Sequence, residues 1–415
     1  MADIATSSAE TAEDRASDRS DRARARVGFF FLNIGHLFDH MFMLIFATAA
    51  IALVGMDGMT YGQLAELATP AFVAFGAFSL PAGWLAGKWS REGMMSVFFI
   101  GIGLSAIAMG FADSANQMML ALFLIGMFAA IYHPVGIAMV VHGKQKVGLA
   151  LGINGVWGNM GIAVAPLATG ILVELSGWRA AFILPGCIAV LFGIAYILFV
   201  RNEARMPAAA KKPIIDPDQS ELEWSVLIRV AIALILTILF GGIVFHTVSF
   251  ALPKLFEERL IAVTTDLKSI GLITGAVFAI ASFAQIVVGR LVDRYSPRTI
   301  LLIVAFLQVP AFAVMATLTG LPAIFVGIIM MMVVFGEIPI HDTIVTRHTK
   351  SAWRSNVFAV KFVIALLVAA VVPKLIGTVH DAYGFETLFF ILSAAAAGVV
   401  MSALILPRAR KITAT

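Results

Sequence analysis

Twelve long apolar runs constrain the fold of this chain more than any other feature. A helix needs about 20 apolar residues to cross the roughly 30 Å hydrocarbon core of a bilayer. The runs cover residues 27–54, 64–86, 93–112, 116–141, 147–175, 179–200, 225–253, 268–289, 299–319, 322–346, 355–379 and 386–406. Because 60% of the residues are hydrophobic and 13% are charged, one soluble core cannot bury this surface. The sequence therefore predicts an all-α membrane protein with twelve transmembrane helices.

Lysine and arginine are distributed unequally between the loops on the two sides of the predicted bundle. If the N-terminus is cytoplasmic, 22 of the 29 cationic residues lie in inner segments and four lie in outer ones. Cytoplasmic loops of membrane proteins carry this excess. We therefore expect both termini in the cytoplasm and the chain in a bacterial inner membrane, and the net charge of +4 requires no nucleic-acid partner.

Polar segments divide the chain into two membrane units. Residues 1–26 and 407–415 are predicted to be cytoplasmic tails, the first of them disordered and without the apolar run of a signal peptide. The polar stretch at 201–224 is predicted to be a cytoplasmic linker. It separates an N-terminal six-helix bundle at 27–200 from a C-terminal one at 225–406. One cysteine, Cys187, permits no internal disulfide.

The two units are an internal repeat. GWLAGKWSR (Gly83–Arg91) aligns with GRLVDRYSPR (Gly289–Arg298) at an offset of 206 residues. Four further pairs fall at offsets of 205 to 207, namely His40 with His246, Pro134 with Pro339, Pro166 with Pro373, and Gly177 with Gly384. A constant offset over corresponding positions indicates a duplication.

With these features the chain resembles the major facilitator superfamily over its whole length after residue 26. The loop Gly-x-Leu-x-Asp-Arg-x-x-x-Arg is complete at Gly289–Arg298, whereas Gly87 occupies the acidic position of the first copy. The resemblance implies two bundles that rock around a central site by alternating access. It also implies a gating role for loop residues: Gly83, Arg91, Gly289, Asp293, Arg294 and Arg298.

A closer resemblance is to the fosmidomycin-resistance-type branch. IYHPVG (Ile131–Gly136) and the following GLALGINGVWGNMGIAVAP (Gly148–Pro166) are similar to that branch's Phe-His-Pro-Glu motif and fifth helix, with Val135 replacing the glutamate. The resemblance implies proton-driven export of toxic or drug-like compounds. Small residues and prolines in this region are expected to serve helix packing and bending: Pro134, Gly155, Gly158, Gly161 and Pro166.

Ionisable residues inside the first helix predict a functional site. GHLFDH places His36, Asp39 and His40 within an arc of about 100° on one helix face, about 15 Å into the bilayer at ~1.5 Å per residue. Ionisable side chains at this depth are costly, so they should face protein or a watery cavity. Repeat transporters hold substrate and coupling ions near this midplane. We interpret the three residues as a proton-coupling or substrate-binding group.

Further candidates lie on the fourth, seventh and tenth helices, which line the central cavity of the resembled fold, and on the eleventh helix. His133 precedes a kinking proline, His246 lies on the seventh helix, Glu337 lies on the tenth, and Lys361 on the eleventh is a candidate partner of Glu337 or of an anionic substrate. A structural role for His133 is an equal alternative. Asn154 and Asn159 are weaker candidates for substrate contact.

Enzymatic and metal functions have little support in the sequence. There is no GxxxxGK[ST] loop for ATP, no HExxH motif or cysteine cluster for a metal, and no nucleophile motif. We therefore expect no cofactor, no metal and no catalysis, and a monomer in the lipid bilayer with protons and a small molecule as partners. Drug-like export is favoured; symport of a small organic anion, a channel and a non-transporting receptor are the alternatives.

Overall fold

The computed structural model describes residues 2–142, 147–203, 224–348 and 351–407. Every described element is helical, which confirms the predicted all-α class. The predicted linker at 201–224 and the tail at 407–415 lie outside the described residues except at their ends. The N-terminal half consists of α1 (Ala2–Leu53), η1 (Met56–Gly58), α2 (Tyr61–Glu66), α3 (Thr69–Lys88), α4 (Arg91–Gly110), α5 (Ala115–Ala129), η2 (Tyr132–Gly136), α6 (Ile137–Val141), α7 (Val147–Ser176) and α8 (Ala180–Glu203).

The described residues of the C-terminal half form six helices. These helices are α9 (Trp224–Arg259), α10 (Leu267–Ser282), α11 (Ala284–Arg294), α12 (Pro297–Met315), α13 (Gly320–His348) and α14 (Ser351–Ile405). The predicted run at 268–289 is divided between α10 and α11, and α14 covers the last two predicted runs. Eleven helical segments of the described chain are long and apolar enough to span a membrane. The count differs from the predicted twelve because the runs at 355–379 and 386–406 join in α14, across a break at Gly384 with φ of 73°.

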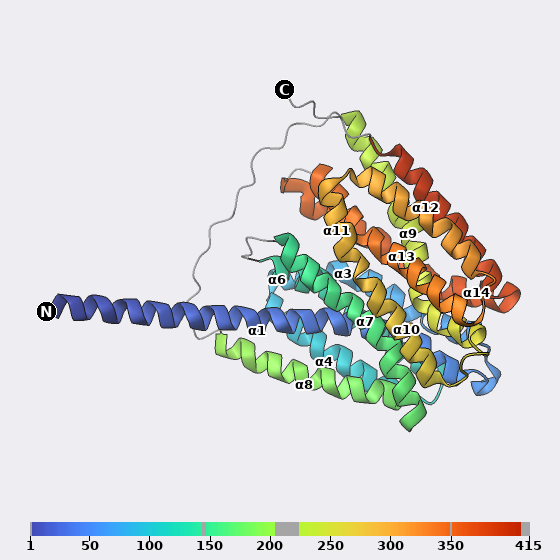
Figure 1. Ribbon diagram of the computed structural model, residues 1–415. Helices are drawn as coiled ribbons and strands as arrows, with labels where there is room; N and C mark the ends of the chain where they lie inside the picture. Colours follow the sequence, from blue (N-terminus) through green and yellow to red (C-terminus); the bar gives the residue numbers. More distant parts are fainter. Residues whose placement is uncertain (1, 143–146, 204–223, 349–350, 408–415) are drawn as a thin grey trace.

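The first helix is longer than its apolar run. It begins at Ala2, whereas the sequence predicts a disordered tail up to residue 26. Alanine and arginine make up 12 of the first 26 residues, and both have high helix propensity. Figure 1 shows the segment extending away from the bundle.

Helices α7 and α14 make close contacts between the halves, and small residues bring the backbones close together. α7 packs against α1 on one side and α10 on the other, while α14 packs against α2 and α3. A Cβ added at Gly271 would lie 2.3 Å from the carbonyl oxygen of Pro166, and one at Gly377 would lie 2.5 Å from that of Gly62. In Figure 1, α1 and α12 approach each other at the end of the molecule that is opposite the two chain termini.

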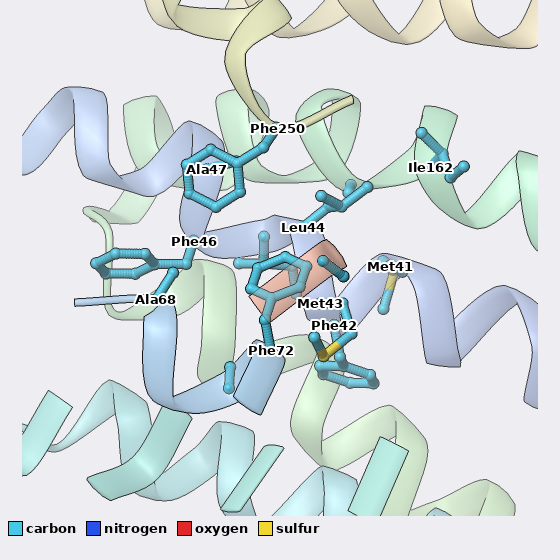
Figure 2. Close-up of a cluster of buried hydrophobic side chains, with 14 of the residues drawn as sticks. Met41, Phe42, Met43, Leu44, Phe46, Ala47, Ala68, Phe72, Ile162 and Phe250 are labelled. Atoms are coloured by element: carbon cyan, nitrogen blue, oxygen red, sulfur yellow. The ribbon is translucent and has the colours of Figure 1, made fainter. Parts of the chain in front are cut away.

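A buried apolar cluster fills the space where the halves converge. Beyond His40, α1 continues through a run of almost fully buried side chains that begins at Met41 and Phe42. Figure 2 shows Phe72 and Phe250 reaching this cluster from the two halves, and their ring centroids lie 6.1 Å apart. The cluster therefore forms an apolar seal on one side of the GHLFDH segment.

Candidate functional site

The first helix presents its three ionisable residues to the protein interior, as their spacing predicts. His36 is 7% exposed, Asp39 is 0% exposed, and His40 is half-buried. The Nδ1 atom of His36 lies 2.8 Å from the carbonyl oxygen of Asn154 on α7. A Cβ at Gly158 would come within 2.6 Å of His36 Nε2, so this glycine provides the space that the imidazole occupies.

A π-helical turn brings His133 to the same place. This turn, η2, contains Pro134, which has no backbone N–H to donate to a regular helix. His133 Nε2 lies 3.2 Å from Asp39 Oδ2. The ring centroid of His133 lies 5.5 Å from that of His36 and 5.6 Å from that of His40. We call His36, Asp39, His40 and His133 the imidazole cluster.

A hydrogen-bond network supports the imidazole cluster from behind. The Tyr132 hydroxyl donates to the Leu32 carbonyl oxygen at 2.8 Å, and the Asn154 amide donates to Asn33 Oδ1 at 3.0 Å and to the Tyr132 oxygen at 2.8 Å. The Tyr132 ring also stacks on His36 at 4.8 Å. The sequence singled out Asn154 but missed Asn33 and Tyr132, because a tyrosine or asparagine in an apolar run gives no signal of its own.

The C-terminal half approaches the imidazole cluster through His246 on α9. Its ring packs edge-on against Phe245 at a centroid distance of 5.1 Å. It also lies close enough to His40 and His133 to interact with them electrostatically. The structure therefore brings five predicted residues into one region of the molecule. They are His36, Asp39, His40 and His133 of the N-terminal half and His246 of the C-terminal half.

The second predicted carboxylate forms a separate site within the C-terminal half. Glu337 on α13 is 5% exposed. Its Oε2 atom accepts a hydrogen bond from Gln308 Nε2 at 2.7 Å, and its Oε1 atom lies 3.2 Å from His341 Nε2. A Cβ at Gly241 on α9 would lie 2.4 Å from Glu337 Oε1. Glu337, Gln308 and His341 are called the carboxylate cluster below.

Gln308 belongs to the carboxylate cluster although the sequence did not predict it. It is fully buried on α12. The side chain of Gln308 is a neutral amide, so the pattern of ionisable residues does not include it. Its position as a lone polar side chain within LLIVAFLQVPAF is the feature that could have indicated a buried polar site.

Lys361 lies beside α13. It is half-buried and forms an ion pair with Asp342. Asp342 is five residues beyond Glu337, and its side chain is 48% exposed. The pair therefore links α14 to α13 near the end of the membrane-spanning part of α13.

The predicted gating residues lie on the helices that flank two short connections, α3 and α4 in the first half and α11 and α12 in the second. A Cβ at Gly83 would meet Pro134 at 3.2 Å, while none of the described residues comes within 4 Å of a Cβ at Gly289. Arg298 donates to the carbonyl oxygen of Leu404 at 3.2 Å. The remaining three gating candidates have exposed positions at helix ends: Arg91, Asp293 and Arg294.

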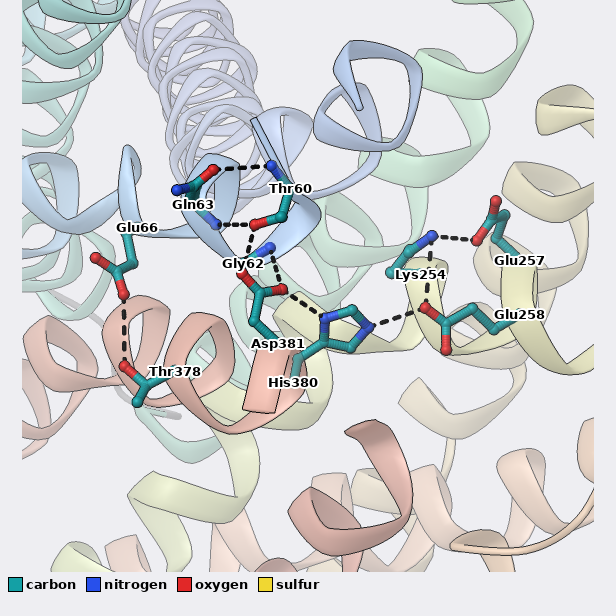
Figure 3. Close-up of polar contacts among 10 residues, drawn as sticks. All are labelled: Thr60, Gly62, Gln63, Glu66, Lys254, Glu257, Glu258, Thr378, His380 and Asp381. Carbon is teal, nitrogen blue, oxygen red and sulfur yellow. Dashed lines mark hydrogen bonds and ion pairs between the residues drawn. The ribbon is translucent and has the colours of Figure 1, made fainter. Parts of the chain in front are cut away.

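A polar network that the sequence did not predict joins the halves at their converging end (Figure 3). Asp381 accepts hydrogen bonds from the Thr60 hydroxyl and, at 3.0 Å, from the Gly62 backbone N–H. His380 lies between two carboxylates, with Nδ1 3.2 Å from Asp381 and Nε2 2.9 Å from Glu258. We call these five residues the latch.

Two further interactions extend the latch. Lys254 lies 3.5 Å from Glu258 and also pairs with Glu257, and Thr378 on α14 donates to Glu66 on α2 at 3.4 Å. Thr60 and Asp381 are 321 residues apart in the chain. No local sequence pattern could have paired them.

Sequence comparison finds relatives of the chain among transport proteins. The chain is 23% identical over 264 residues to a nitrite extrusion protein of Bacillus subtilis (strain 168), covering 63% of this chain and 64% of the relative. It is 23% identical over 188 residues to a probable hexose phosphate transport protein of Chlamydia trachomatis serovar D, covering 44% and 41%. The chain thus spans less than two thirds of the length of these relatives.

The fold matches a solved structure along almost the whole chain. A bacterial homolog of the human lysosomal transporter Spinster, in an inward-facing and unoccupied conformation, superposes with a TM-score of 0.71 at 16% identity, covering 92% of this chain and 95% of that one. The model of the Major Facilitator Superfamily matches residues 29–336 and 260–414. The chain, with its paired helical halves and polar residues buried between apolar helices, belongs to the Major Facilitator Superfamily.

Proposed function

We propose that this protein is a proton-coupled secondary transporter of a small anionic compound. The observation that carries the proposal is the carboxylate cluster: Glu337 is buried in an apolar helical bundle and held by the neutral amide of Gln308. An ionised carboxylate costs several kcal/mol in hydrocarbon and much less in a hydrated cavity. A carboxylate that alternates between these environments can bind a proton on one side of the membrane and release it on the other.

The class of substrate is inferred from the imidazole cluster. Histidine N–H groups donate hydrogen bonds and gain positive charge on protonation, so several of them around one space favour an anion. Nitrite and hexose phosphate, which appear in the names of two relatives, are both anions. Drug-like export remains a prediction of the branch resemblance.

The latch and the apolar seal support an alternating-access mechanism. If both termini are cytoplasmic, as the charge distribution predicts, the latch lies on the external side and holds that side closed. Opening it would require Thr60 and Gly62 to separate from Asp381, and the seal at Phe72 and Phe250 to part. The substrate site would then face the cell interior in the conformation described.

The test uses proteoliposomes that contain an internal pH dye. Glucose 6-phosphate, which does not cross lipid unaided, is added to the wild type and to Glu337→Gln, with nitrite as a second probe and protein-free liposomes as the blank. We expect a substrate-dependent pH change that Glu337→Gln loses. The matched control is Asp57→Asn, which removes an exposed carboxylate at φ of 52°, a conformation that asparagine tolerates.

Three outcomes separate the parts of the proposal. The same pH change in wild type and Glu337→Gln would assign the proton to another group. Anion flux without any pH change would contradict proton coupling. Export of a hydrophobic cation such as ethidium, with no anion flux, would replace the anion by a drug-like substrate. The sign of the pH change distinguishes symport from exchange.

A further inference from the structure

Three histidines from two separate helices meet in the arrangement of a metal site. His36, His40 and His133 each offer a ring nitrogen, and these atoms lie within 4.8 Å of one another. Nitrogen ligands of a tetrahedral ion with bonds of about 2.0–2.1 Å are separated by roughly 3.4 Å. Side-chain rotations that move each ring nitrogen by about 1 Å would therefore bring the three atoms to tetrahedral ligand spacing.

The surroundings of His36 prepare it to act as a ligand. A carbonyl oxygen only accepts hydrogen bonds, so the contact with the Asn154 carbonyl places the proton of a neutral His36 on Nδ1. The lone pair is then on Nε2, which is buried and has no hydrogen-bond partner among the residues that the structure describes. Histidine ligands of metals commonly donate their other N–H to a backbone carbonyl in this way. The Gly158 backbone leaves room for this ring orientation.

Asp39 supplies a negative charge beside the three imidazoles. It is fully buried, and its Oδ2 atom lies 3.2 Å from His133 Nε2. A carboxylate next to a ligand histidine orients the ring and increases its basicity, and its charge reduces the cost of placing a divalent cation inside a membrane protein. His40 and His133 are only half-buried, which leaves a side from which an ion and an anionic ligand can enter.

We propose that His36, His40 and His133 bind one late first-row divalent transition-metal ion of the Zn²⁺ type, with Asp39 as the carboxylate that orients His133. Neutral imidazole suits Zn²⁺, Co²⁺, Ni²⁺ and Cu²⁺. Three protein ligands leave a fourth position open. That position would accept water or an anion, and so the site recognises either a metal ion or a metal complex of a small anion.

The test is a titration with Co²⁺, whose visible absorption reports four-coordinate nitrogen ligation. The full chain is purified in detergent through an affinity tag that contains no histidine. We expect one Co²⁺ per chain, displaced by one equivalent of Zn²⁺. Removal of an outer-shell partner weakens metal binding by about 10–100-fold, so His36→Ala, His40→Ala and His133→Ala should each weaken it by about 100-fold or more, and Asp39→Asn by about 10–100-fold.

Control variants separate loss of a ligand from loss of folding. His142→Ala removes an exposed histidine and should leave the titration unchanged. Each variant must elute as a monodisperse peak with wild-type helical circular dichroism, and His40→Gln provides a second substitution of similar size. As an independent readout, Zn²⁺ should raise the unfolding temperature of the wild type and of His142→Ala but not that of His133→Ala.

The proposal is overturned if the wild type gives no four-coordinate Co²⁺ spectrum, or if the three histidine variants titrate like the wild type. It does not depend on the proposed transport function. Glu337→Gln should bind Co²⁺ normally even if it has lost proton coupling. Conversely, proton-coupled anion flux that persists in EDTA would leave the transport proposal standing without a metal.

Discussion

The two halves of the molecule place different chemistry at corresponding positions. At the offset set by Pro134 and Pro339, the position of Tyr132 corresponds to that of Glu337. In the first half the tyrosine hydroxyl belongs to a neutral network behind the imidazole cluster. In the second half the glutamate is itself the centre of the carboxylate cluster and is held by Gln308.

This difference indicates that the two halves repeat the helical framework but not the polar residues of the site. Kinking prolines recur at matching points, and they open the backbone of η2 and lie within α13. The polar side chains near them are not repeated. We therefore expect the two clusters to perform separable tasks, with ligand binding in the first half and proton transfer in the second.

The largest predicted effect comes from neutralising the carboxylate of the second half. Glu337→Gln should reduce accumulation driven by a pH gradient by about 100-fold, because the variant retains a hydrogen-bonding group but cannot exchange a proton. Counterflow of preloaded substrate, which needs no net proton movement, should continue. His40→Asn should instead reduce both activities, so counterflow lost equally in the two variants would remove the distinction between the clusters.

A second prediction compares glycines that face the two clusters. Gly158→Ala places a methyl group 2.6 Å from the His36 ring, and Gly241→Ala places one 2.4 Å from Glu337 Oε1. Overpacking costs about 1–3 kcal/mol. The imidazole is stacked on Tyr132, whereas the end of the glutamate side chain can rotate away. Gly158→Ala should therefore lower the thermal unfolding temperature more than Gly241→Ala.

Gly152→Ala is the matched control for the glycine pair. It lies on α7, the same helix as Gly158, and no atom of the described part of the chain lies within 4 Å of its added Cβ. Because alanine has a higher helix propensity than glycine, this variant should be neutral or slightly stabilising. An equal loss of stability in all three variants would indicate that the alanine affects the helices and not the clusters.

A third prediction tests whether the latch controls access to both clusters. Asp381→Ala removes the acceptor for Thr60 and Gly62 and one partner of His380. Hydrogen bonds to charged groups contribute about 1.5–3 kcal/mol, so the closed state should lose stability and a cysteine at buried Ala68 should react with maleimide about tenfold faster or more.

The labelling is measured in a Cys187→Ser background, because Cys187 is exposed and is the only cysteine of the chain. Thr378→Val serves as the comparison, since it removes the exposed 3.4 Å hydrogen bond to Glu66 at the edge of the latch, and should change the rate much less. Unchanged labelling of Asp381→Ala would show that the latch does not limit opening.

The smallest predicted effect is at the neutral position of the first half. Tyr132→Phe keeps the ring that stacks on His36 but removes the hydroxyl that bonds Leu32 and Asn154. A net loss of about 1 kcal/mol in stability is expected for a buried hydrogen bond, with a small decrease in unfolding temperature. Tyr383→Phe, at a residue that is 71% exposed, should have no effect; a matching decrease there would refute the assignment.

The sequence by itself determined the membrane class, the duplication and the buried polar face of α1. These properties depend on composition, on a constant offset and on the helical period, all of which are local or additive along the chain. His36, Asp39 and His40 could be grouped because they are separated by no more than four residues on one helix. The superfamily could be recognised from the sequence for the same reason, because its loop motif is contiguous in the chain.

Only the tertiary structure decided which side chains from different helices meet. It brought His133 to the first-helix histidines, Gln308 to Glu337, and Asp381 to Thr60 across 321 residues. Such contacts depend on the rotation, tilt and kinks of whole helices. Those quantities follow from packing over many residues, including the π-helical turn at Pro134, and no single apolar run specifies them.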